Sequence, residues 1–363
     1  MSGRDQEGWD WMPASATAAQ ISSLMNMTGW YFSTTNLPNS QLVSPGRFGY
    51  GQALRPNGVN LAQFSAVKPI GGQNSAGGWV SVGYKTGPAN NFAAAFVGVF
   101  DAVNNQVLAT VSFEQNGVIK AWRGWPGANL LGASEPGVYL DTVWEDIEAF
   151  FKVGATGGEI LVRVNTGSVL SLINVDTQPG ANAYFDSYCF GFYYPGGATT
   201  ADFYLDDLRY YDMAGTINNT WLGTCRVQTC LPTANGATTD FTRSNTSLAN
   251  WQNIANQNVD DTLYLSDANA GDFNLSAVEP LVNSPVVAWV GVTSFLRQDD
   301  ATQITAKNRI VSGSTTADGA AYLTAQTYAA DTDVFETDPA TGVQFTGAGV
   351  NALQIGPLVF AIA

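Results

Sequence analysis

The sequence predicts an all-β protein: a β-sandwich followed by a second β-rich sandwich domain, with one short helix near the N-terminus. Apolar residues alternate with polar ones in many short runs, which is the pattern of half-buried strands. Gly, Asn, Pro and Asp separate these runs, and they are the residues that turns prefer. Helical spacing is confined to 15–27, where Ile21, Leu24 and Met25 recur on one face.

The elements of the first domain follow from these patterns in chain order. Ser15 or Thr17 is a suitable N-cap for the helix, and Gly29 a suitable end. Asn116 and Gly117 form the strongest turn signal of the chain, and residues 165–167 form another tight turn. The predicted strands of this domain lie at 79–84, 94–100, 106–113, 118–122, 144–153, 159–164, 168–173, 188–194 and 201–211.

A polar, turn-rich stretch at 212–219 marks the boundary between the two domains. We therefore expect an N-terminal segment at 1–43 that either packs on the first domain or docks on a neighbour, a first domain at 44–222 and a second domain at 223–363 that docks or oligomerises. Free sheet edges and the apolar C-terminus at 358–363 are candidate docking elements. The predicted strands of the second domain lie at 262–265, 286–292, 304–311 and 320–328.

The composition excludes several classes of function. Acidic residues outnumber basic ones 30 to 15, and the resulting net charge of −15 argues against nucleic acids and anionic membranes as partners. Because the chain has no histidine, it has no Ser-His-Asp triad, no Cys-His pair and no His-ligated zinc. The N-terminus lacks the apolar region of a signal peptide, and no apolar run is long enough to cross a membrane. We expect a soluble protein made in a cytoplasm.

The three cysteines allow more than one reading. Cys189, Cys225 and Cys230 are most simply small buried apolar residues, because a secreted disulfide scaffold would have more cysteines in even number. A disulfide between Cys225 and Cys230 would form only in an oxidising compartment. The sequence leaves the oxidation state of Cys225 and Cys230 open.

Four segments carry a resemblance to a known fold. They are an opening strand at 47–54, the sequence Trp144-Glu-Asp-Ile-Glu148, the hairpin at 159–170 and a closing strand at 203–208. Their order resembles the concanavalin A-like, laminin-G-type jelly roll over the stretch from Gly46 to Asp212. Thr166 departs from that pattern, because it separates Asn165 from Gly167. The resemblance implies a jelly-roll sandwich for the first domain.

A second resemblance extends over the whole chain. It rests on residues at 206–208, 212, 215, 219, 221–223, 226 and 232–236, and on the late sequences at 338–342 and 351–356. In this order they are similar to tail- and head-associated structural proteins of bacteriophages. The resemblance implies a location in the virion, with other virion proteins and copies of the chain as partners. We expect a homo-oligomer with closed symmetry, a trimer or a higher assembly.

Two pairs of carboxylates are candidates for hydrolytic or metal chemistry. Glycoside hydrolysis needs two carboxylates about 5–5.5 Å apart, or about 6.5–9.5 Å apart for inversion. Asp146 and Glu148 share a strand face, but the glycosidase motif of jelly rolls is absent, so a depolymerase using this pair is the least favoured hypothesis. Asp206 and Asp207 are candidates for a calcium site at a sheet rim. No other cofactor is expected.

Aromatic residues give the one candidate for a ligand site. Trp125 lies between turn-forming residues, next to Trp122 and Arg123, and all three could contact a sugar ring from a surface loop. The sequence therefore predicts a non-enzymatic structural protein of a phage virion, attached to the tail, a fibre or the head. The alternative is a carbohydrate-binding or receptor-binding module for a host-surface glycan.

Overall fold

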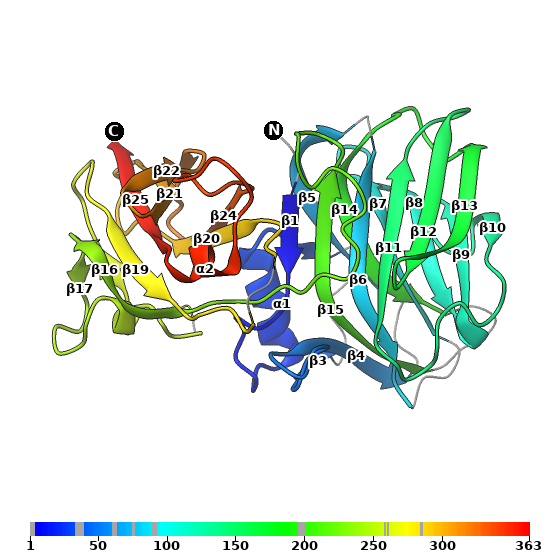
Figure 1. Cartoon of the computed structure of the whole chain (residues 1–363), viewed down its shortest axis with the longest axis horizontal. Coiled ribbons are helices and arrows are strands. Elements are labelled where there is room, and N and C mark those ends of the chain that lie inside the picture. Colours follow the sequence, from blue (N-terminus) through cyan, green and yellow to red (C-terminus); the bar gives the residue numbers. More distant parts are fainter. Residues whose placement is uncertain are drawn as a thin grey trace. The chain divides into compact units, whose positions relative to one another are not determined.

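A computed structural model describes residues 4–32, 40–59, 64–74, 77–88, 93–194, 200–257, 259, 261–283 and 286–363 (Figure 1). The chain divides into two compact units. The first contains Met1–Asp10, Ala14–Asn26 and Trp30–Val227, and the second contains Trp11–Pro13, Met27–Gly29 and Gln228–Ala363. The unit boundary thus follows Val227, and most of the segment 1–43 belongs to the first unit. The all-β prediction is confirmed.

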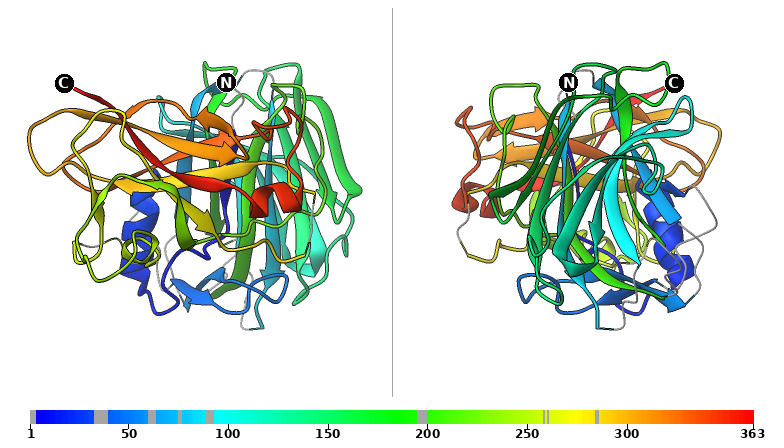
Figure 2. Two further views of the ribbon diagram at one scale, coloured as in Figure 1. Left: turned by 60° about the vertical axis from the view of Figure 1, so that its left-hand side comes forward. Right: turned by 90° about the vertical axis from the view of Figure 1, so that its right-hand side faces the viewer.

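The first unit is a sandwich of two antiparallel sheets (Figures 1 and 2). In order across the sheet, the strands of the eight-stranded sheet are β13 (Gly167–Val175), β12 (Gly158–Val164), β11 (Glu145–Lys152), β6 (Gly78–Thr86), β15 (Thr200–Asp212), β4 (Ala53–Val59) and β3 (Ser40–Val43), with β1 (Arg4–Glu7) also paired to β15. Those of the seven-stranded sheet are β10 (Asn129–Ala133), β9 (Val118–Arg123), β8 (Gln106–Glu114), β7 (Ala94–Asp101), β14 (Phe185–Tyr193), β5 (Phe64–Asn74) and β2 (Tyr31–Phe32).

Aromatic side chains from both sheets meet in the core of this sandwich. The ring of Tyr84 in β6 lies 4.7 Å from that of Phe113 in β8, and Tyr210 of β15 stacks on Tyr188 of β14 at 5.6 Å. The strand period of two explains the arrangement, because alternate residues of each strand point to the same face. In β7 every residue is buried, so both faces of that strand are covered.

Local sequence signals set the turns and the helix. Helix α1 (Ala18–Met27) begins with a capping box, in which the Gln20 amide N–H donates to Thr17 Oγ1 and Gln20 Oε1 accepts from the Thr17 N–H. Of the two predicted N-caps, Thr17 is the one used. Asn165 and Thr166, with φ of 47° and 74°, form the turn between β12 and β13.

The second unit contains a six-stranded sheet and two strand pairs. In order across the sheet the strands are β16 (Pro232–Thr239), β19 (Asn274–Val278), β25 (Gln354–Ile362), β21 (Ile304–Ser312) and β22 (Thr315–Asp318), with β23 (Tyr322–Leu323) also paired to β21. The pairs are β17 (Thr242–Arg243) with β18 (Leu265–Ser266) and β20 (Val290–Leu296) with β24 (Ala329–Phe335). A short helix, α2 (Gly347–Asn351), precedes β25, and Ile310, Phe345 and Leu353 lie in the core.

Three expectations for this unit differ from the structure. The strands predicted at 262–265 and 320–328 overlap β18 and β23 by one or two residues only. The apolar C-terminus is not wholly free, because β21 pairs with β25 as far as Ile362. On the other side of β25, β19 pairs with Gln354 and Ile355, and Phe273 bridges to Leu358. The apolar residues of β25 serve the unit's own sheet. In the described part of the chain, no helix has both the length and the apolar character needed to span a membrane.

Candidate functional site

The outer face of the seven-stranded sheet brings together residues from four strands, β7, β8, β9 and β14. Pairing of β8 with β9 sets Ser112 opposite Lys120, and pairing of β7 with β8 sets Phe96 opposite Ser112. On the same face, Tyr193 of β14 lies opposite Ala94. These residues point away from the sandwich core. The register of the sheet, and not proximity in sequence, therefore builds this surface.

A chain of hydrogen bonds on this face ends at the carboxylate of Glu114. The indole Nε1 of Trp122 donates to Ser112 Oγ at 2.8 Å, and Ser112 Oγ donates to Glu114 Oε1 at 2.6 Å. The hydroxyl of Tyr193 donates to the same oxygen. The other oxygen, Glu114 Oε2, lies 3.6 Å from Lys120 Nζ. One carboxylate oxygen is thus held by two hydroxyl donors, while the second faces a lysine.

The Glu114 carboxyl group is unusually buried for an acidic side chain on the outer face of a sheet. Glu114 is 7% exposed, and a carboxylate is rarely buried unless charge or hydrogen bonds compensate the loss of water. Burial, with the hydrogen bond to Glu114 as the second cause, raises the pKa of Tyr193 above that of an ordinary phenol. Tyr193 is therefore a neutral hydrogen-bond donor throughout the physiological range.

Aromatic rings frame the carboxylate. Trp122 and Tyr193 meet edge to face at 6.4 Å, and the ring of Trp122 lies 5.7 Å from Lys120 Nζ. Trp125 is half-buried and packs edge to face on Phe96 at 5.5 Å. We call Ser112, Glu114, Lys120, Trp122, Trp125 and Tyr193 the Glu114 site.

The loop that carries Trp125 is held to the sheet by its backbone. Thr110 Oγ1 donates to the carbonyl of Gly124 at 2.9 Å, and the Gly124 N–H donates to the Leu108 carbonyl at 2.8 Å. Gly124 and Gly127 adopt φ of 81° and 88°, a region that glycine occupies without strain. The turn chemistry therefore fixes the position of Trp125 over the sheet face.

The three ligand-binding residues predicted from the sequence have different fates. Trp122 and Trp125 both belong to the Glu114 site, although Trp122 is only 8% exposed and donates its N–H inside the protein. Arg123 does not join them, because its guanidinium forms an ion pair with Asp176. That these residues bind a sugar stays a prediction.

Sequence reasoning did not single out Glu114, Ser112, Tyr193 and Lys120 as a group. Glu114 and Tyr193 are 79 residues apart in the chain and meet only because β7 lies between β8 and β14. An isolated Glu in an otherwise apolar, alternating strand was the signal available for Glu114. On a half-buried strand such a residue is most simply a solvated one, so this signal by itself does not indicate a site.

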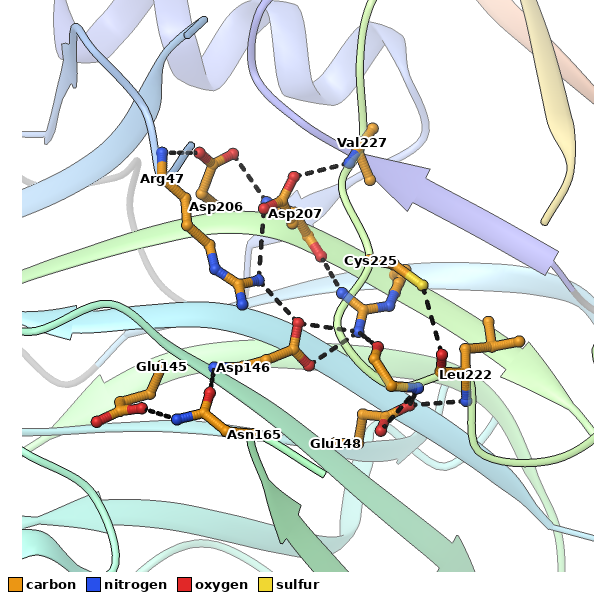
Figure 3. Close-up of polar contacts among 12 residues, drawn as sticks. Arg47, Glu145, Asp146, Glu148, Asn165, Asp206, Asp207, Leu222, Cys225 and Val227 are labelled. Carbon is orange, nitrogen blue, oxygen red and sulfur yellow. Dashed lines mark hydrogen bonds and ion pairs between the residues drawn. The ribbon is translucent and has the colours of Figure 1, made fainter. Parts of the chain in front are cut away.

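The outer face of the eight-stranded sheet holds a second polar cluster, shown in Figure 3. Asp146 accepts from Arg47 Nη1 at 2.7 Å and from Arg209 Nη2 at 2.9 Å. Glu148 accepts from the Tyr211 hydroxyl at 2.5 Å and from the N–H groups of Leu222 and Gly223, each at 3.1 Å. Burial raises the pKa of Glu148, and Tyr211 and Arg209 oppose that shift.

These contacts determine whether Asp146 and Glu148 can reach a substrate. Both side chains are at most 2% exposed, and their oxygens are taken by protein donors. The segment that begins at Leu222 lies directly over them (Figure 3). A substrate could reach this pair only if that segment moved, so the pair hypothesised for a depolymerase is a structural ion network.

Asp206 and Asp207 belong to the same cluster. Asp206 accepts from the backbone N–H groups of Arg47 and Asp207, both at 2.8 Å, and Asp207 accepts from the Val227 N–H at 2.7 Å. Burial and the neighbouring Asp207 raise the pKa of Asp206, and burial raises that of Asp207. Within the described ranges no group of three or more acidic or cysteine side chains is placed to hold a metal ion. Calcium binding by these two residues therefore stays a prediction without support from their geometry.

No protein-family profile and no curated protein sequence matches this chain. Similar solved structures include the alginate lyase vAL-1 from Chlorella virus, at 11% identity over 55% of this chain and 99% of that one, with a TM-score of 0.39. A carbohydrate esterase from the Shiga toxin-encoding bacteriophage phi24B matches at 13% identity over 57% and 99%, with a TM-score of 0.36. The carbohydrate-binding module CBM66 from Bacillus subtilis matches at 12% over 52% and 98%, with a TM-score of 0.32.

These findings correct one prediction. The similar structures include alginate lyases, a sialidase and a carbohydrate esterase, so the prediction that the chain is not an enzyme is wrong. Its physical basis was the absence of histidine, but Glu, Asp, Tyr and Lys also serve as general acids and bases. At these identities and TM-scores the likeness concerns the sandwich fold and assigns neither a substrate nor a site. A role in a virion is not shown either.

Proposed function

We propose that the first unit binds a glycan at the Glu114 site. The observation that carries this proposal is the unequal use of the two Glu114 oxygens. Oε1 accepts from both Ser112 and Tyr193, whereas among the residues that the structure describes Oε2 has only Lys120 near it, at 3.6 Å. A carboxylate held in this way is preorganised to accept a hydrogen bond from a sugar hydroxyl. Trp125 supplies the partly exposed aromatic ring on which a sugar ring can stack.

Binding by oligosaccharides tests this proposal directly. Calorimetric titration of the full chain should show binding that Trp125→Ala and Glu114→Gln each weaken at least tenfold. Trp221→Ala is the matched control, because Trp221 is also half-buried but packs on Trp79 and Arg163 of the other sheet. Equal loss in all three variants, or none in Trp125→Ala and Glu114→Gln, would contradict the proposal.

Cleavage of the bound glycan is a second candidate function, favoured by the contact between Glu114 and Tyr193. A carboxylate next to a neutral phenol provides a proton acceptor and a proton donor within one site. In an elimination, Glu114 would take the proton next to a sugar carboxylate and Tyr193 would give one to the leaving oxygen, so that a C–O bond breaks and a C=C bond forms. The product's ultraviolet absorbance measures the reaction, and Glu114→Gln should abolish it.

The virion location, the virion proteins as partners and the trimer remain proposals that rest on the sequence resemblance. A glycan-binding sandwich on a phage tail or fibre would contact glycans of the host surface. Glycan binding at the Glu114 site is therefore compatible with the virion role that the sequence resemblance implies. Light scattering of the purified chain tests the oligomer: a single monomeric mass at all concentrations would contradict a self-assembling trimer.

A further inference from the structure

A second candidate ligand site lies on the outer face of the eight-stranded sheet, beside the ion network of Figure 3. Lys85 of β6 and Tyr204 of β15 are paired in register, and Trp144 immediately precedes β11. The Lys85 ammonium lies 4.1 Å from the centroid of the Tyr204 ring and 5.0 Å from that of Trp144. The two rings meet edge to face at 6.1 Å. The lysine is therefore held between two half-buried aromatic rings.

The charges around Lys85 are unbalanced. Arg55 lies on the same face, 5.0 Å from the Tyr204 ring, but its guanidinium is paired at two points with the fully buried Asp202, at 2.8 and 3.1 Å. Among the residues that the structure describes, no carboxylate lies within 4.0 Å of Lys85 Nζ. Burial and the charge of Arg55 lower the pKa of Lys85, whereas Asp202 raises it. The negative charge of Asp202 is thus shared with Arg55, and among the described residues Lys85 has no carboxylate in direct ion-pair contact.

The chemistry of these groups selects one kind of ligand. An anion would form the direct ion pair that Lys85 lacks and would also lie within the field of Arg55. The faces of Trp144 and Tyr204 favour a ligand with C–H groups to stack on them, which inorganic anions lack. We propose that Lys85, Trp144, Tyr204 and Arg55 bind a carboxylate-bearing sugar unit, with the carboxylate at Lys85 and the sugar ring against Trp144. This site is independent of the Glu114 site, because the two lie on different sheets.

Titration of the full chain with uronate trimers and with matched neutral trimers tests the inference. Lys85→Met keeps the apolar stem and removes the charge, so uronate affinity should fall at least tenfold while affinity for neutral trimers is unchanged. Lys85→Arg should retain most of the binding, and Trp144→Leu should weaken it with the lysine still present. Inorganic phosphate, added as a separate probe, should compete only weakly.

The outcomes separate this inference from the proposed function. Loss of uronate binding in Lys85→Met but not in Trp125→Ala supports the second site even if the Glu114 site binds nothing. Unchanged uronate binding in Lys85→Met, or no uronate binding by the unaltered chain, overturns the inference. Competition by phosphate as strong as that by uronates would also overturn it, because the sugar ring would then contribute nothing.

Discussion

The backbone N–H of Gly223 donates to the Glu148 carboxylate, 3.1 Å from Oε1 and 3.2 Å from Oε2. This bond places the segment after β15 over the outer face of the eight-stranded sheet, where the neighbouring Leu222 N–H also reaches Oε1 (Figure 3). Part of that face is therefore occupied by the chain itself. Among the described residues, the Glu114 carboxylate on the other sheet accepts from two side-chain hydroxyls and faces Lys120, with no backbone N–H bonded to it. This contrast underlies the functional proposal.

Removal of the Glu148 carboxylate should destabilise the first unit strongly. Glu148→Ala leaves the N–H groups of Leu222 and Gly223 without their acceptor and leaves Arg209 with one carboxylate fewer, which should cost about 3–5 kcal/mol of unfolding free energy. Glu148→Gln keeps an acceptor and should cost less. Urea unfolding measures both, with the exposed Glu135→Ala as control at under about 0.5 kcal/mol. A loss in Glu148→Ala no larger than in the control would contradict the structural role.

The Asp206–Asp207 pair should make stability depend on pH. Because both folded-state pKa values are raised above the ordinary value of about 3.9, the folded chain binds protons that the unfolded chain has released. This contribution to stability is fully present below pH of about 4 and is lost as pH rises through the raised pKa values. The unfolding free energy of the natural chain, relative to Asp206→Asn, should therefore fall as pH increases. A pH-independent difference between the two proteins would contradict raised folded-state pKa values for this pair.

The turn at Thr166 should store strain that glycine relieves. Thr166 is β-branched and exposed, and its φ of 74° lies in a region that such residues avoid. Thr166→Gly should raise the unfolding free energy by about 1 kcal/mol. Thr316→Gly, at an exposed strand position of β22, should instead lower it, because glycine loses more backbone entropy there. Destabilisation by both substitutions would argue against strain at Thr166.

The Tyr193 hydroxyl should contribute to both stability and binding. Tyr193→Phe removes one of the two donors to Glu114 Oε1, at an expected cost of about 1–3 kcal/mol of unfolding free energy. Because the carboxylate is then less firmly oriented, glycan affinity should also fall. Tyr50→Phe is the control, since Tyr50 is 51% exposed. If Tyr193→Phe changed the unfolding free energy and the glycan affinity no more than Tyr50→Phe does, the hydrogen bond to Glu114 would contribute to neither stability nor binding.

Local features were predictable from the sequence because their causes are local. The helix, its capping residue Thr17 and the turn at 165–167 each depend on residues within a few positions of one another. The strands of the first unit follow from alternation, because their buried faces are strongly apolar. In the second unit the strands at 232–239 and 329–335 are rich in Ala, Thr and Asp, and alternation there is too weak to mark them.

The sites were only partly predictable, because their partners are distant in the chain. Trp122 and Trp125 are three residues apart and were found together, whereas Tyr193 reaches Glu114 only through the order of strands in the sheet. The prediction of a calcium ligand at Asp206 takes no account of its hydrogen-bond partner, the backbone N–H of Arg47, because that group is 159 residues away in the chain. The sequence shows which type of side chain stands at each position. Which hydrogen-bond donors reach that side chain depends on how the strands pair.

A crystal structure of the chain with a bound oligosaccharide tests the central claim most directly. The account predicts a sugar ring stacked against Trp125, with a hydroxyl group within hydrogen-bond distance of Glu114 Oε2, on the outer face of the seven-stranded sheet. A glycan bound only elsewhere on the molecule, or an unoccupied Glu114 site at saturating ligand concentration, would contradict it.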